Sequence, residues 1–366
     1  MSFEPNTLFP GLLSESALRV AQDASSRPVG QTPASTTRDM GWNAVLIPED
    51  QGGAGGDFQD LAAIVEALAT HVVNLPVITR SGIVPALLNT LREQPATQAI
   101  LTDIAEGTAV VELAGPLSRD ESTPPLKAQR TDQGWQLSGS TTACELTDEC
   151  THVLLIASDV VDGSLLVACT AIENLQAAKS RYLSMDERPV IVFDLDQFTL
   201  PDPQVIANGQ QAAQAIYTGW RIAVAGMATD SVCCMGSALS RTITYLQQRK
   251  QFGQALADFQ ALRHDVARLY ISYELSRGLL LATLRTLEQP PGTDHDTSAL
   301  DLLGLYLGQE AIRFSESVIQ LHGGMGMTRE MPVARLATRL IANALRFGDP
   351  LTYHQKIHNL RLQETQ

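Results

Sequence analysis

The sequence predicts an α+β protein built from three consecutive parts. These are an N-terminal helical domain (residues 1–108), a middle antiparallel β-barrel or sandwich (109–204) and a C-terminal four-helix bundle (205–366). Apolar residues recur at helical spacing in the first part, and short strand-like runs replace them in the middle. The helical period returns after Pro201 and Pro203. A chain of 366 residues is long enough to bury a large core.

The N-terminal part contains several helical patterns and one glycine-rich stretch. One pattern starts after Asp57, a suitable N-cap, and others cover residues 81–91 and 96–105. The glycine cluster within 41–56 follows an apolar run, so a dinucleotide-binding loop has to be considered. The G-x-G-x-x-G spacing is absent, Pro48 intervenes and no βαβ unit follows. We therefore interpret this stretch as a flexible loop.

The middle part is predicted to form strands. Strand-like runs occupy residues 109–114, 126–131, 134–139, 152–157, 164–169 and 189–194. Residues 132–134 lie between two alternating runs and predict a hairpin. Several short strands at regular spacing are typical of a small antiparallel barrel or sandwich.

The C-terminal part is predicted to be a bundle of long helices. They are expected over residues 205–250, 258–287, 298–321 and 332–345, with a loop over 288–294. The two consecutive prolines and the glycine in that loop are typical helix breakers.

Composition limits the possible partners and compartments. The formal net charge is −14 and the isoelectric point is about 4.9, so nucleic acid and anionic membranes are not expected partners. Five cysteines without C-x-x-C spacing argue against a disulfide framework or a zinc site and favour a reducing cytoplasm. The first ten residues do not resemble a signal peptide, and no apolar run approaches about 18 residues, so membrane insertion is not expected.

Residues 249–253 (R-K-Q-F-G) allow two interpretations. Basic residues followed by Gly253 suit the C-terminus of a helix, where the glycine supplies a left-handed cap. Alternatively, the planar guanidinium of Arg249 makes paired hydrogen bonds to a pyrophosphate, and Phe252 packs against a flat ring.

Residues 320–326 (Q-L-H-G-G-M-G) also suit the end of a helix. Three glycines exceed what one cap requires, however, and they would let the backbone approach a ligand closely. Gln320 has the side chain to hydrogen-bond an adenine edge or a phosphate. Both segments therefore favour a phosphate-bearing cofactor.

Together with the order of the three parts, these segments resemble the acyl-CoA dehydrogenase family. The matching motifs are R-x-Q-F-G at 249–253, F-Q-x-x-x-H at 259–264, Q-x-H-G-G-x-G at 320–326, T-x-E-x-P-V-x-R at 328–335, P-E-x-x-G-G-x-G at 48–55 and the stretch 185–194 that closes the β part. The resemblance spans nearly the whole chain. It implies FAD, an acyl-CoA thioester substrate, a tetramer and an acceptor of the electron-transfer flavoprotein type.

In that family, the R-x-Q-F-G segment and the Q-x-H-G-G turn reach across to the FAD of a neighbouring subunit. By this resemblance, the residues expected to bind the ADP portion of a neighbour's FAD are Arg249, Gln251, Phe252, Gln260, Gln320, Gly323 and Gly324.

The sequence departs from the family at the catalytic base. The reaction needs a carboxylate that removes the acidic α-proton while the β-hydride moves to the flavin. Phe347 and Trp220 stand at the two positions where the family places that glutamate, and neither side chain can act as a base. Glu330 belongs to the T-x-E-x-P run and is interpreted as part of a helix start. Asp349, two residues from Phe347, would face another side of any helix.

Two flavin-contacting segments of the β part also depart from the family. The family's T-E-P-x-A-G-S corresponds to residues 112–119, and its K-x-W-I-S/T corresponds to 141–145. The indole and hydroxyl groups expected to touch the isoalloxazine are missing. Glu145 beside an electron-rich reduced flavin would be electrostatically unfavourable.

The segments offered to a neighbour are thus kept, whereas those serving this chain's own flavin are lost. This pattern predicts a subunit of a hetero-oligomeric acyl-CoA dehydrogenase that completes a partner's FAD site. It resembles the less conventional subunit of heterotetrameric (α2β2) dehydrogenases of bacterial steroid side-chain degradation. Two alternatives stay open: an autonomous homomeric dehydrogenase with an unusual base such as Asp349, and a non-enzymatic scaffold subunit.

Overall fold

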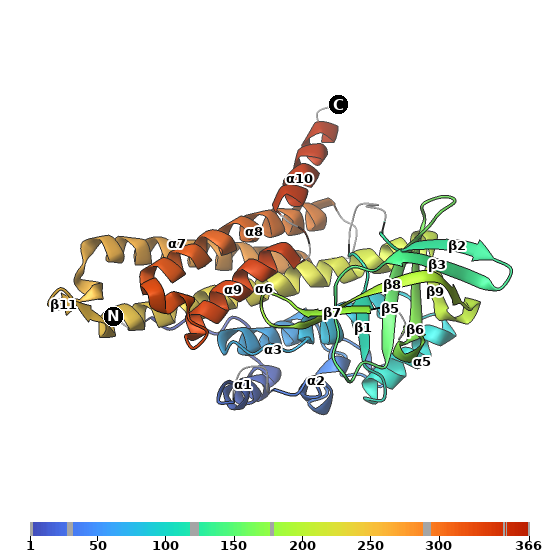
Figure 1. Cartoon of the computed structure of the whole chain (residues 1–366), viewed down its shortest axis with the longest axis horizontal. Helices are drawn as coiled ribbons and strands as arrows, with labels where there is room; N and C mark the ends of the chain where they lie inside the picture. Colours follow the sequence, from blue (N-terminus) through green and yellow to red (C-terminus); the bar gives the residue numbers. More distant parts are fainter. Residues whose placement is uncertain are drawn as a thin grey trace. The chain divides into compact units, whose positions relative to one another are not determined.

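The computed structural model describes residues 3–27, 32–117, 124–175, 179–287, 294–346, 348 and 350–364. The chain forms two compact units, whose elements are labelled in Figure 1. The helical unit comprises Met1–Val29, Ala62–Asn74 and Val224–Gln366, and the sheet unit comprises Gly30–Leu61 and Leu75–Ala223.

The order of elements confirms the predicted fold class, with helices first, strands in the middle and helices again. The α-helices are α1 (Leu12–Ser25), α2 (Thr36–Asp39), α3 (Phe58–Thr70), α4 (Val84–Thr90), α5 (Pro95–Ala105), α6 (Gly209–Gln248), α7 (Gln260–Leu287), α8 (Asp294–His322), α9 (Pro332–Arg346) and α10 (Pro350–Glu364). Short helical turns are η1 (Trp42–Ala44), η2 (Glu49–Gln51), η3 (Ile78–Ile83), η4 (Ile172–Leu175), η5 (Asp202–Gln204), η6 (Leu256–Asp258) and η7 (Gly323–Met327). The strands are β1 (Val111–Ala114), β2 (Lys127–Thr131), β3 (Gly134–Ser140), β4 (Cys144–Glu145), β5 (His152–Asp159), β6 (Leu165–Ala171), β7 (Lys179–Leu183), β8 (Pro189–Leu200), β9 (Val205–Asn208), β10 (Lys250–Gln251) and β11 (Gln254–Ala255).

Within the described residues, β1 to β9 form one sheet with the path β4-β8-β3-β2-β5-β6-β9, to which β1 adds at β5 and β7 at β8. Most pairs are antiparallel, as predicted, but β1 and β2 both run parallel to β5. The predicted hairpin joins β2 to β3, with Thr131 opposite Gly134. Gly134 has φ +119°, and a Cβ there would lie 2.5 Å from the carbonyl oxygen of Leu200, so the turn requires glycine.

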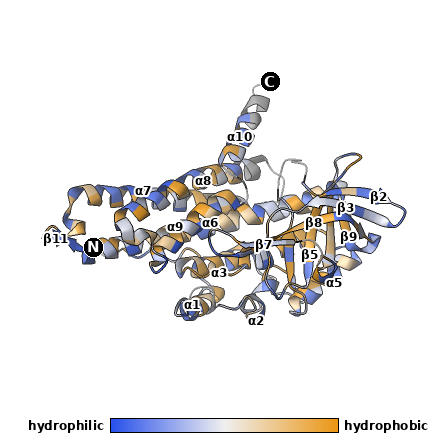
Figure 2. Cartoon of the chain, in the orientation of Figure 1, coloured by the Kyte–Doolittle hydropathy of each residue, from blue (hydrophilic) through white to orange (hydrophobic). Residues whose placement is uncertain are grey.

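The core of the sheet unit explains why its strands read as apolar runs rather than as alternating ones. Residues 153–158 of β5 are all buried, because this strand is covered on both faces. Figure 2 shows the hydrophobic residues concentrated on strands such as β5 and β8. All five cysteines of the chain are free thiols, and Cys144 and Cys150 are buried in this core.

The start of the C-terminal part corrects one prediction. The helix expected from residue 205 begins at Gly209, because Val205–Asn208 forms β9 and pairs with β6. An 18-residue window of α6 is apolar enough to cross a membrane by length and composition, but 94% of it is buried within the structure. This helix is therefore a buried core helix.

The last part also contains a helix that the sequence did not predict, since α10 follows the four expected helices. The expected loop at 288–294 lies outside the described residues, except for Asp294, which begins α8. Further upstream, the carboxylate of Asp57 accepts the backbone N–H of Gln59 at 2.8 Å, so the predicted N-cap is confirmed.

The glycine-rich stretch 41–56 is a compact turn rather than an open loop. It contains η1 and η2, and Gly53, Gly55 and Gly56 each donate a backbone N–H to a carbonyl within the same stretch. These bonds satisfy backbone groups that an open loop would leave to water.

A buried ion pair connects three helices of the helical unit. Arg339 of α9 donates to the carboxylate of Asp230 on α6, with one N–O distance of 2.9 Å. The same guanidinium donates to the carbonyl of Val73 after α3 at 2.8 Å and to the side chain of Asn74 at 3.0 Å. Asn343 donates to Oδ2 of Asp230 at 2.5 Å, the oxygen that also accepts from Nε of Arg339, so charge and hydrogen-bonding capacity are largely matched.

Candidate functional site

The segment 249–253 forms a hairpin directly after α6. Strands β10 and β11 pair antiparallel, with Gln251 opposite Gln254, and Phe252 and Gly253 make the two-residue turn. Both turn residues have positive φ, +54° for Phe252 and +84° for Gly253. Gly253 is therefore the second residue of a tight hairpin turn, which corrects its interpretation as the cap of α6.

Phe252 is presented to solvent at the tip of this hairpin. Its side chain is 89% exposed, and its ring contacts Phe259 edge-to-face with centroids 6.2 Å apart. A bulky residue at positive φ is uncommon, and such strain tends to persist where it serves a site. The turn thus holds an aromatic ring away from this chain's own core.

The segment 320–326 contains the end of α8 and most of η7. Each of its three glycines lies in a different local environment. A Cβ on Gly326 would lie 2.8 Å from the carbonyl oxygen of Ile319, so this chain's own packing excludes a side chain. Gly323 has φ +57°, which favours glycine. Gly324 has neither constraint: nothing lies within 4 Å of its virtual Cβ. The space beside the Gly324 backbone is open among the described residues.

Tyr245 and His322 join the two segments, and sequence reasoning assigned neither a role. The Tyr245 ring on α6 stacks on the His322 ring at 4.4 Å between centroids. The Tyr245 hydroxyl donates to the carbonyl oxygen of His322 at 3.4 Å. Because Tyr245 lies one helical turn before Arg249 and His322 directly precedes Gly323, the hairpin and the glycine turn are neighbours.

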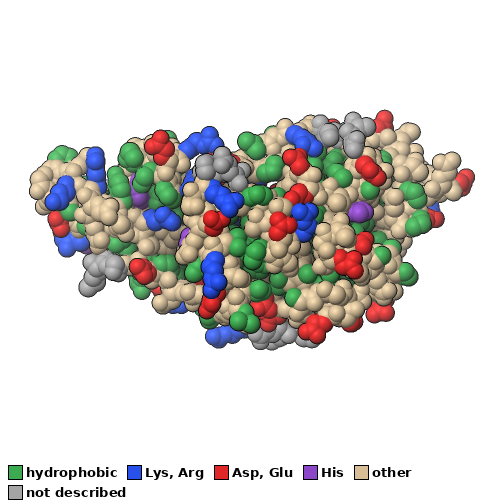
Figure 3. Space-filling model, turned by 90° about the horizontal axis from the view of Figure 1, so that it is seen from below, with side chains coloured by type: hydrophobic (Ala, Val, Ile, Leu, Met, Phe, Trp, Pro, Cys, Tyr) green, Lys and Arg blue, Asp and Glu red, His purple; other side chains and the backbone are tan. Residues whose placement is uncertain are grey.

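We call the seven expected cofactor residues the clamp: Arg249, Gln251, Phe252, Gln260, Gln320, Gly323 and Gly324. All seven are exposed. The guanidinium of Arg249 makes no ion pair with any carboxylate in the part of the chain that the structure describes. Basic side chains are visible at the left end of Figure 3, the end at which Figure 1 labels β11.

His322 itself is a packing residue. It is buried, and its Nδ1 lies 3.0 Å from the carbonyl oxygen of Val318. Burial lowers the pKa of this imidazole, so the ring is neutral near pH 7. A neutral stacked ring fixes the turn without adding a second cation to the clamp.

The structure describes one of the two positions at which a base was sought. Trp220 on α6 is 1% exposed and stacks on Tyr217 with centroids 5.7 Å apart. A buried indole in this place supplies packing and no proton acceptor. Phe347 and Asp349 lie outside the described residues. Glu330 is exposed in the turn before α9.

The first altered flavin segment begins at a buried hydrogen bond between an arginine and a glutamate of the sheet unit. Glu112 on β1 accepts from Nε of Arg80 at 2.7 Å, and Arg80 also donates to the hydroxyl of Thr147 and to the carbonyl of Ala34. Burial raises the pKa of Glu112 to about 8, and Arg80 only partly offsets it. The carboxyl group is enclosed by this chain and faces inward.

The second altered segment is closed in the same way, which changes the picture of Glu145. The Glu145 carboxylate lies 3.3 Å from a guanidinium nitrogen of Arg188, and Arg188 also pairs with Asp186 at 2.7 Å. Ser184 donates to Asp186 at 2.5 Å. Glu145 is therefore held by its own chain's arginine and is not a bare negative charge.

These contacts test which groups the chain can hold. The clamp presents a free guanidinium, side-chain amides and an open glycine, which fit the phosphates and adenine of a dinucleotide. The segments at Glu112 and Glu145 are occupied by the Arg80–Glu112 and Arg188–Glu145 contacts and lack the indole, so they do not fit an isoalloxazine. Among the described residues, no group of three or more His, Cys, Asp or Glu side chains could hold a metal ion.

Known proteins resemble this chain in its C-terminal domain and in its fold. Residues 208–349 match the model of the acyl-CoA dehydrogenase C-terminal domain. The C-terminal part of the chain is therefore similar to this domain, and the whole chain has the fold of acyl-CoA dehydrogenases. The acyl-CoA dehydrogenase IpdE2 of Mycolicibacterium smegmatis is 26% identical over 312 residues, which cover 85% of this chain and 81% of that protein.

Solved acyl-CoA dehydrogenase structures share the fold over almost the whole chain. A Tcur3481–Tcur3483 steroid acyl-CoA dehydrogenase variant superposes with a TM-score of 0.81 at 20% identity, over 96% of this chain and 97% of that one. The ChsE4–ChsE5 complex from Mycobacterium tuberculosis gives 0.80 at 18% identity, over 96% of each chain. An FAD complex of PigA gives 0.81 at 18% identity, over 99% of this chain and 100% of that one, so a protein with this fold is known to bind FAD.

Proposed function

We propose that the chain is a subunit of an FAD-dependent acyl-CoA dehydrogenase, an oxidoreductase that introduces an α,β double bond into an acyl-CoA thioester. Its role is to complete the FAD site of a partner subunit through the clamp. The observation that carries this proposal is the clamp itself. Its seven exposed residues lie after α6, in the β10–β11 hairpin, at the start of α7, at the end of α8 and in η7, and the Tyr245–His322 contact joins α6 to α8 beside two of these segments.

The clamp supports a neighbour's cofactor because the polar side chains of its residues make no hydrogen bond or ion pair within the part of the chain that the structure describes. Arg249 offers paired donors to a pyrophosphate, and Gln251, Gln260 and Gln320 offer amides to phosphate or adenine. Gly324 leaves the backbone accessible to a bound group. FAD, when bound, accepts the hydride from the substrate's β-carbon.

The partner subunit supplies the base and the isoalloxazine bed in this proposal. The described position for a base holds the buried Trp220. The flavin segments hold the Arg80–Glu112 and Arg188–Glu145 pairs, each closed within the sheet unit. An acyl-CoA bound to this assembly would therefore react at the partner's flavin and not at one held by this chain.

The remaining assignments rest on similarity. The ChsE4–ChsE5 complex consists of two different proteins of this fold, which supports the proposal of a heterotetramer. The similarity to a steroid acyl-CoA dehydrogenase variant supports the proposal of a steroid side-chain CoA substrate. We propose an acceptor of the electron-transfer flavoprotein type, a place in lipid metabolism and a reducing cytoplasm that suits five free cysteines. We keep 1–108, 109–204 and 205–366 as its functional parts.

The decisive measurement is the ratio of FAD to chain. Purified alone, the chain should retain little FAD. Purified with its partner, the assembly should contain one FAD per pair of chains. A yellow homotetramer with one FAD per subunit would instead establish an autonomous enzyme, whose base would be tested with Asp349→Asn. If Arg249→Ala does not change the FAD content of the assembly, the chain is a scaffold subunit.

A further inference from the structure

Helix α7, labelled in Figure 1, presents an apolar stripe to solvent, although its opposite face already packs within the helical unit. Ile271 is 57% exposed and Leu275 is 59% exposed. Residues three or four positions apart share one face of a helix, and the exposed residues on this face are Ala267, Ile271, Leu275, Gly278 and Ala282. The stripe is roughly 22 Å long. An exposed apolar face of this extent is typical of a contact with another chain.

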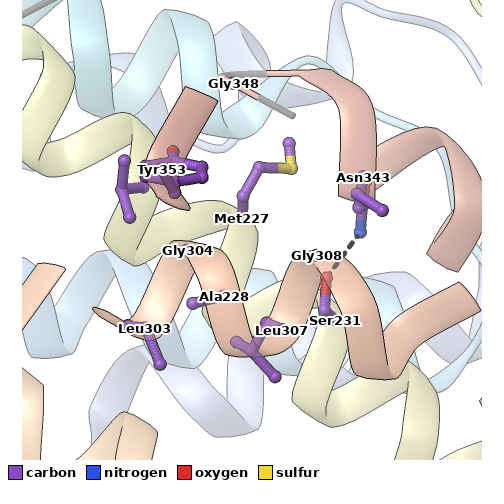
Figure 4. A pocket seen from close by; sticks show the side chains of 12 residues that line it. Met227, Ala228, Ser231, Leu303, Gly304, Leu307, Gly308, Asn343, Gly348 and Tyr353 are labelled. Atoms are coloured by element: carbon purple, nitrogen blue, oxygen red, sulfur yellow. Dashed lines mark hydrogen bonds between the residues drawn. The ribbon is translucent and has the colours of Figure 1, made fainter. Parts of the chain in front are cut away.

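Gly278, within this stripe, is not required by the packing of the described residues. Glycine is unfavourable in the interior of a helix compared with alanine. Nothing lies within 4 Å of the place that a Cβ on Gly278 would take. Gly304 of α8 shows the contrast, because a Cβ there would lie 2.5 Å from the ring of Tyr353 (Figure 4). The chain's own packing therefore explains Gly304, whereas Gly278 would let a second backbone approach α7 closely from outside.

A charged pair lies along one edge of the stripe. Arg277 donates to the carboxylate of Glu274 at 2.7 Å, and the two side chains are 33% and 32% exposed. Positions 274 and 277 are equally far from the midpoint between residues 275 and 276. A second α7 that lies antiparallel about this midpoint would therefore place its Arg277 beside Glu274 and its Glu274 beside Arg277. The edge of the stripe is thus complementary in charge to a second copy of itself.

The same antiparallel arrangement fits the apolar side chains. The large residues Ile271 and Leu275 lie in the first half of the stripe, and the small residues Gly278 and Ala282 lie in the second half. About the midpoint, Ile271 of one copy faces the space between Gly278 and Ala282 of the other, and the two Leu275 side chains meet. Parallel helices would instead set Ile271 against Ile271 and leave a gap where Gly278 faces Gly278. A face that is complementary to itself in charge and in size is expected of a two-fold contact between identical chains.

The charges of α7 also avoid the repulsion that two chains of net charge −14 would otherwise meet. The helix carries more basic than acidic side chains, namely Arg263, Arg268, Arg277 and Arg285 against Asp265 and Glu274. Asp265 is paired with Arg268 at 2.7 Å. Two copies can therefore meet at α7 without bringing acidic surfaces together.

We propose that α7 is the surface through which two copies of this chain associate, with their α7 helices antiparallel about a two-fold axis near residues 275 and 276. This inference goes beyond the proposed function, because it concerns a contact between two copies of this chain and not the contact with the partner that carries FAD. The clamp stays accessible, since α7 ends at Leu287, which lies opposite His264, and Gln260 lies beyond that point. In a heterotetramer, the α7 contact joins two pairs of chains.

The first test is Gly278→Leu in the assembly as purified. Nothing in the described chain lies near this position, so the variant should fold and should melt no lower than the unaltered protein. The added side chain should hold the two helices apart and raise the dissociation constant between copies about tenfold or more in analytical ultracentrifugation. Ser317→Leu, which adds the same side chain at an exposed position of α8, is the matched control and should leave association unchanged. A folded Gly278→Leu that associates as tightly as the unaltered protein would overturn the proposal.

A charge exchange tests the edge of the stripe. Glu274→Arg and Arg277→Glu each bring like charges together across the contact, so each alone should weaken association about two- to fivefold. The double variant again sets opposite charges against each other, and it should associate as tightly as the unaltered protein. A double variant that associates no better than the single ones would contradict the antiparallel contact.

Cross-linking tests the direction of the helices. Leu275→Cys would meet its own copy in the antiparallel contact, so oxidation with copper phenanthroline should join two copies of this chain by a disulfide. Ala282→Cys would lie roughly 20 Å from its copy and should not be joined. The unaltered chain, whose cysteines are free thiols, gives the background.

Two results of the cross-linking would overturn the proposal. Equal cross-linking at both positions would mean parallel helices, and cross-linking at neither would mean that another protein covers α7. The FAD ratio is measured on the same samples, and it tests the proposed function separately, since the substituted residues of α7 lie outside the clamp.

Discussion

Arginine side chains serve two opposite purposes in this molecule. Arg80, Arg188 and Arg339 are buried, and each is hydrogen-bonded to an acidic side chain of its own unit. Arg249 stands exposed at a hairpin and meets no carboxylate in the described part of the chain. A buried arginine without its partner would be costly, whereas an exposed one is available to a ligand. The enclosed arginines therefore belong to the fold, and the exposed one belongs to the clamp.

We expect the largest effect on stability from the substitution of a buried arginine. Arg339→Met leaves Asp230 buried without its cation and removes the donor to Val73, so it should lower the free energy of unfolding by about 3–5 kcal/mol. Chemical denaturation measures this. Arg19→Ala, which breaks an exposed pair with Glu15, should change stability by less than about 0.5 kcal/mol. Equal changes in the free energy of unfolding for the two variants would show that the buried and the exposed arginine pairs do not differ in their contribution to stability.

Substitution of the exposed Arg249 should leave the fold intact. Arg249→Ala removes charge-assisted hydrogen bonds worth about 1.5–3 kcal/mol, so FAD affinity of the assembly should fall about 10- to 100-fold. Flavin absorbance after dialysis measures the loss. Lys250→Ala is the control, since Lys250 is equally exposed on β10 but is not part of the clamp. A large fall in melting temperature with Arg249→Ala would mean that Arg249 is structural after all.

The glycines of η7 offer the same contrast within a few residues. Gly326→Ala should destabilise the chain by about 1–3 kcal/mol, because its methyl would meet the carbonyl of Ile319. Gly324→Ala should change stability by less than about 0.5 kcal/mol and lower FAD content instead. Thermal melts and flavin absorbance separate the two. A Gly324→Ala assembly with full FAD would show that nothing binds against that backbone.

The last expected effect is a pH dependence of stability from Glu112, which is spread over several pH units. Burial raises its pKa from 4.5 to about 8, so between these values the folded chain holds a proton that the unfolded chain has released. Its contribution to stability is therefore fully present below pH 4.5 and is lost as pH rises through about 8, by at most about 1.4 kcal/mol per pH unit. Denaturation at several pH values should show that Glu112→Gln flattens this slope. An unchanged slope would assign it to other groups.

The sequence was a good guide wherever a pattern is local. The segments around β1, β2, β3, β5, β6 and β8, the hairpin at Gly134 and the N-cap at Asp57 all follow from spacing and turn chemistry. β9 was missed because its few apolar residues merge with the helical period of α6, and its strand character comes from pairing with β6. The seating of α10 also depends on contacts distant in sequence, from Tyr353 to Gly304.

Contacts between residues distant in sequence also limited the prediction of the clamp. Its residues were predicted from motifs, and their use in FAD binding stays a prediction. The contact that makes the two motifs neighbours, Tyr245 on His322, spans 77 positions and leaves no local signal. The hairpin turn was missed because Phe252–Gly253 lacks the Asn-Gly or Asp-Gly pair that marks such turns.

The free cysteines allow the unfolding of each unit to be followed separately through the reactivity of its buried thiols. Cys144 and Cys150 are buried in the sheet unit, and Cys233 is buried on α6 in the helical unit. Burial raises the pKa of all three thiols, that of Cys150 to about 12, so none is reactive while its surroundings are closed. Alkylation followed by peptide mapping would therefore time the exposure of the two units separately, without any introduced label.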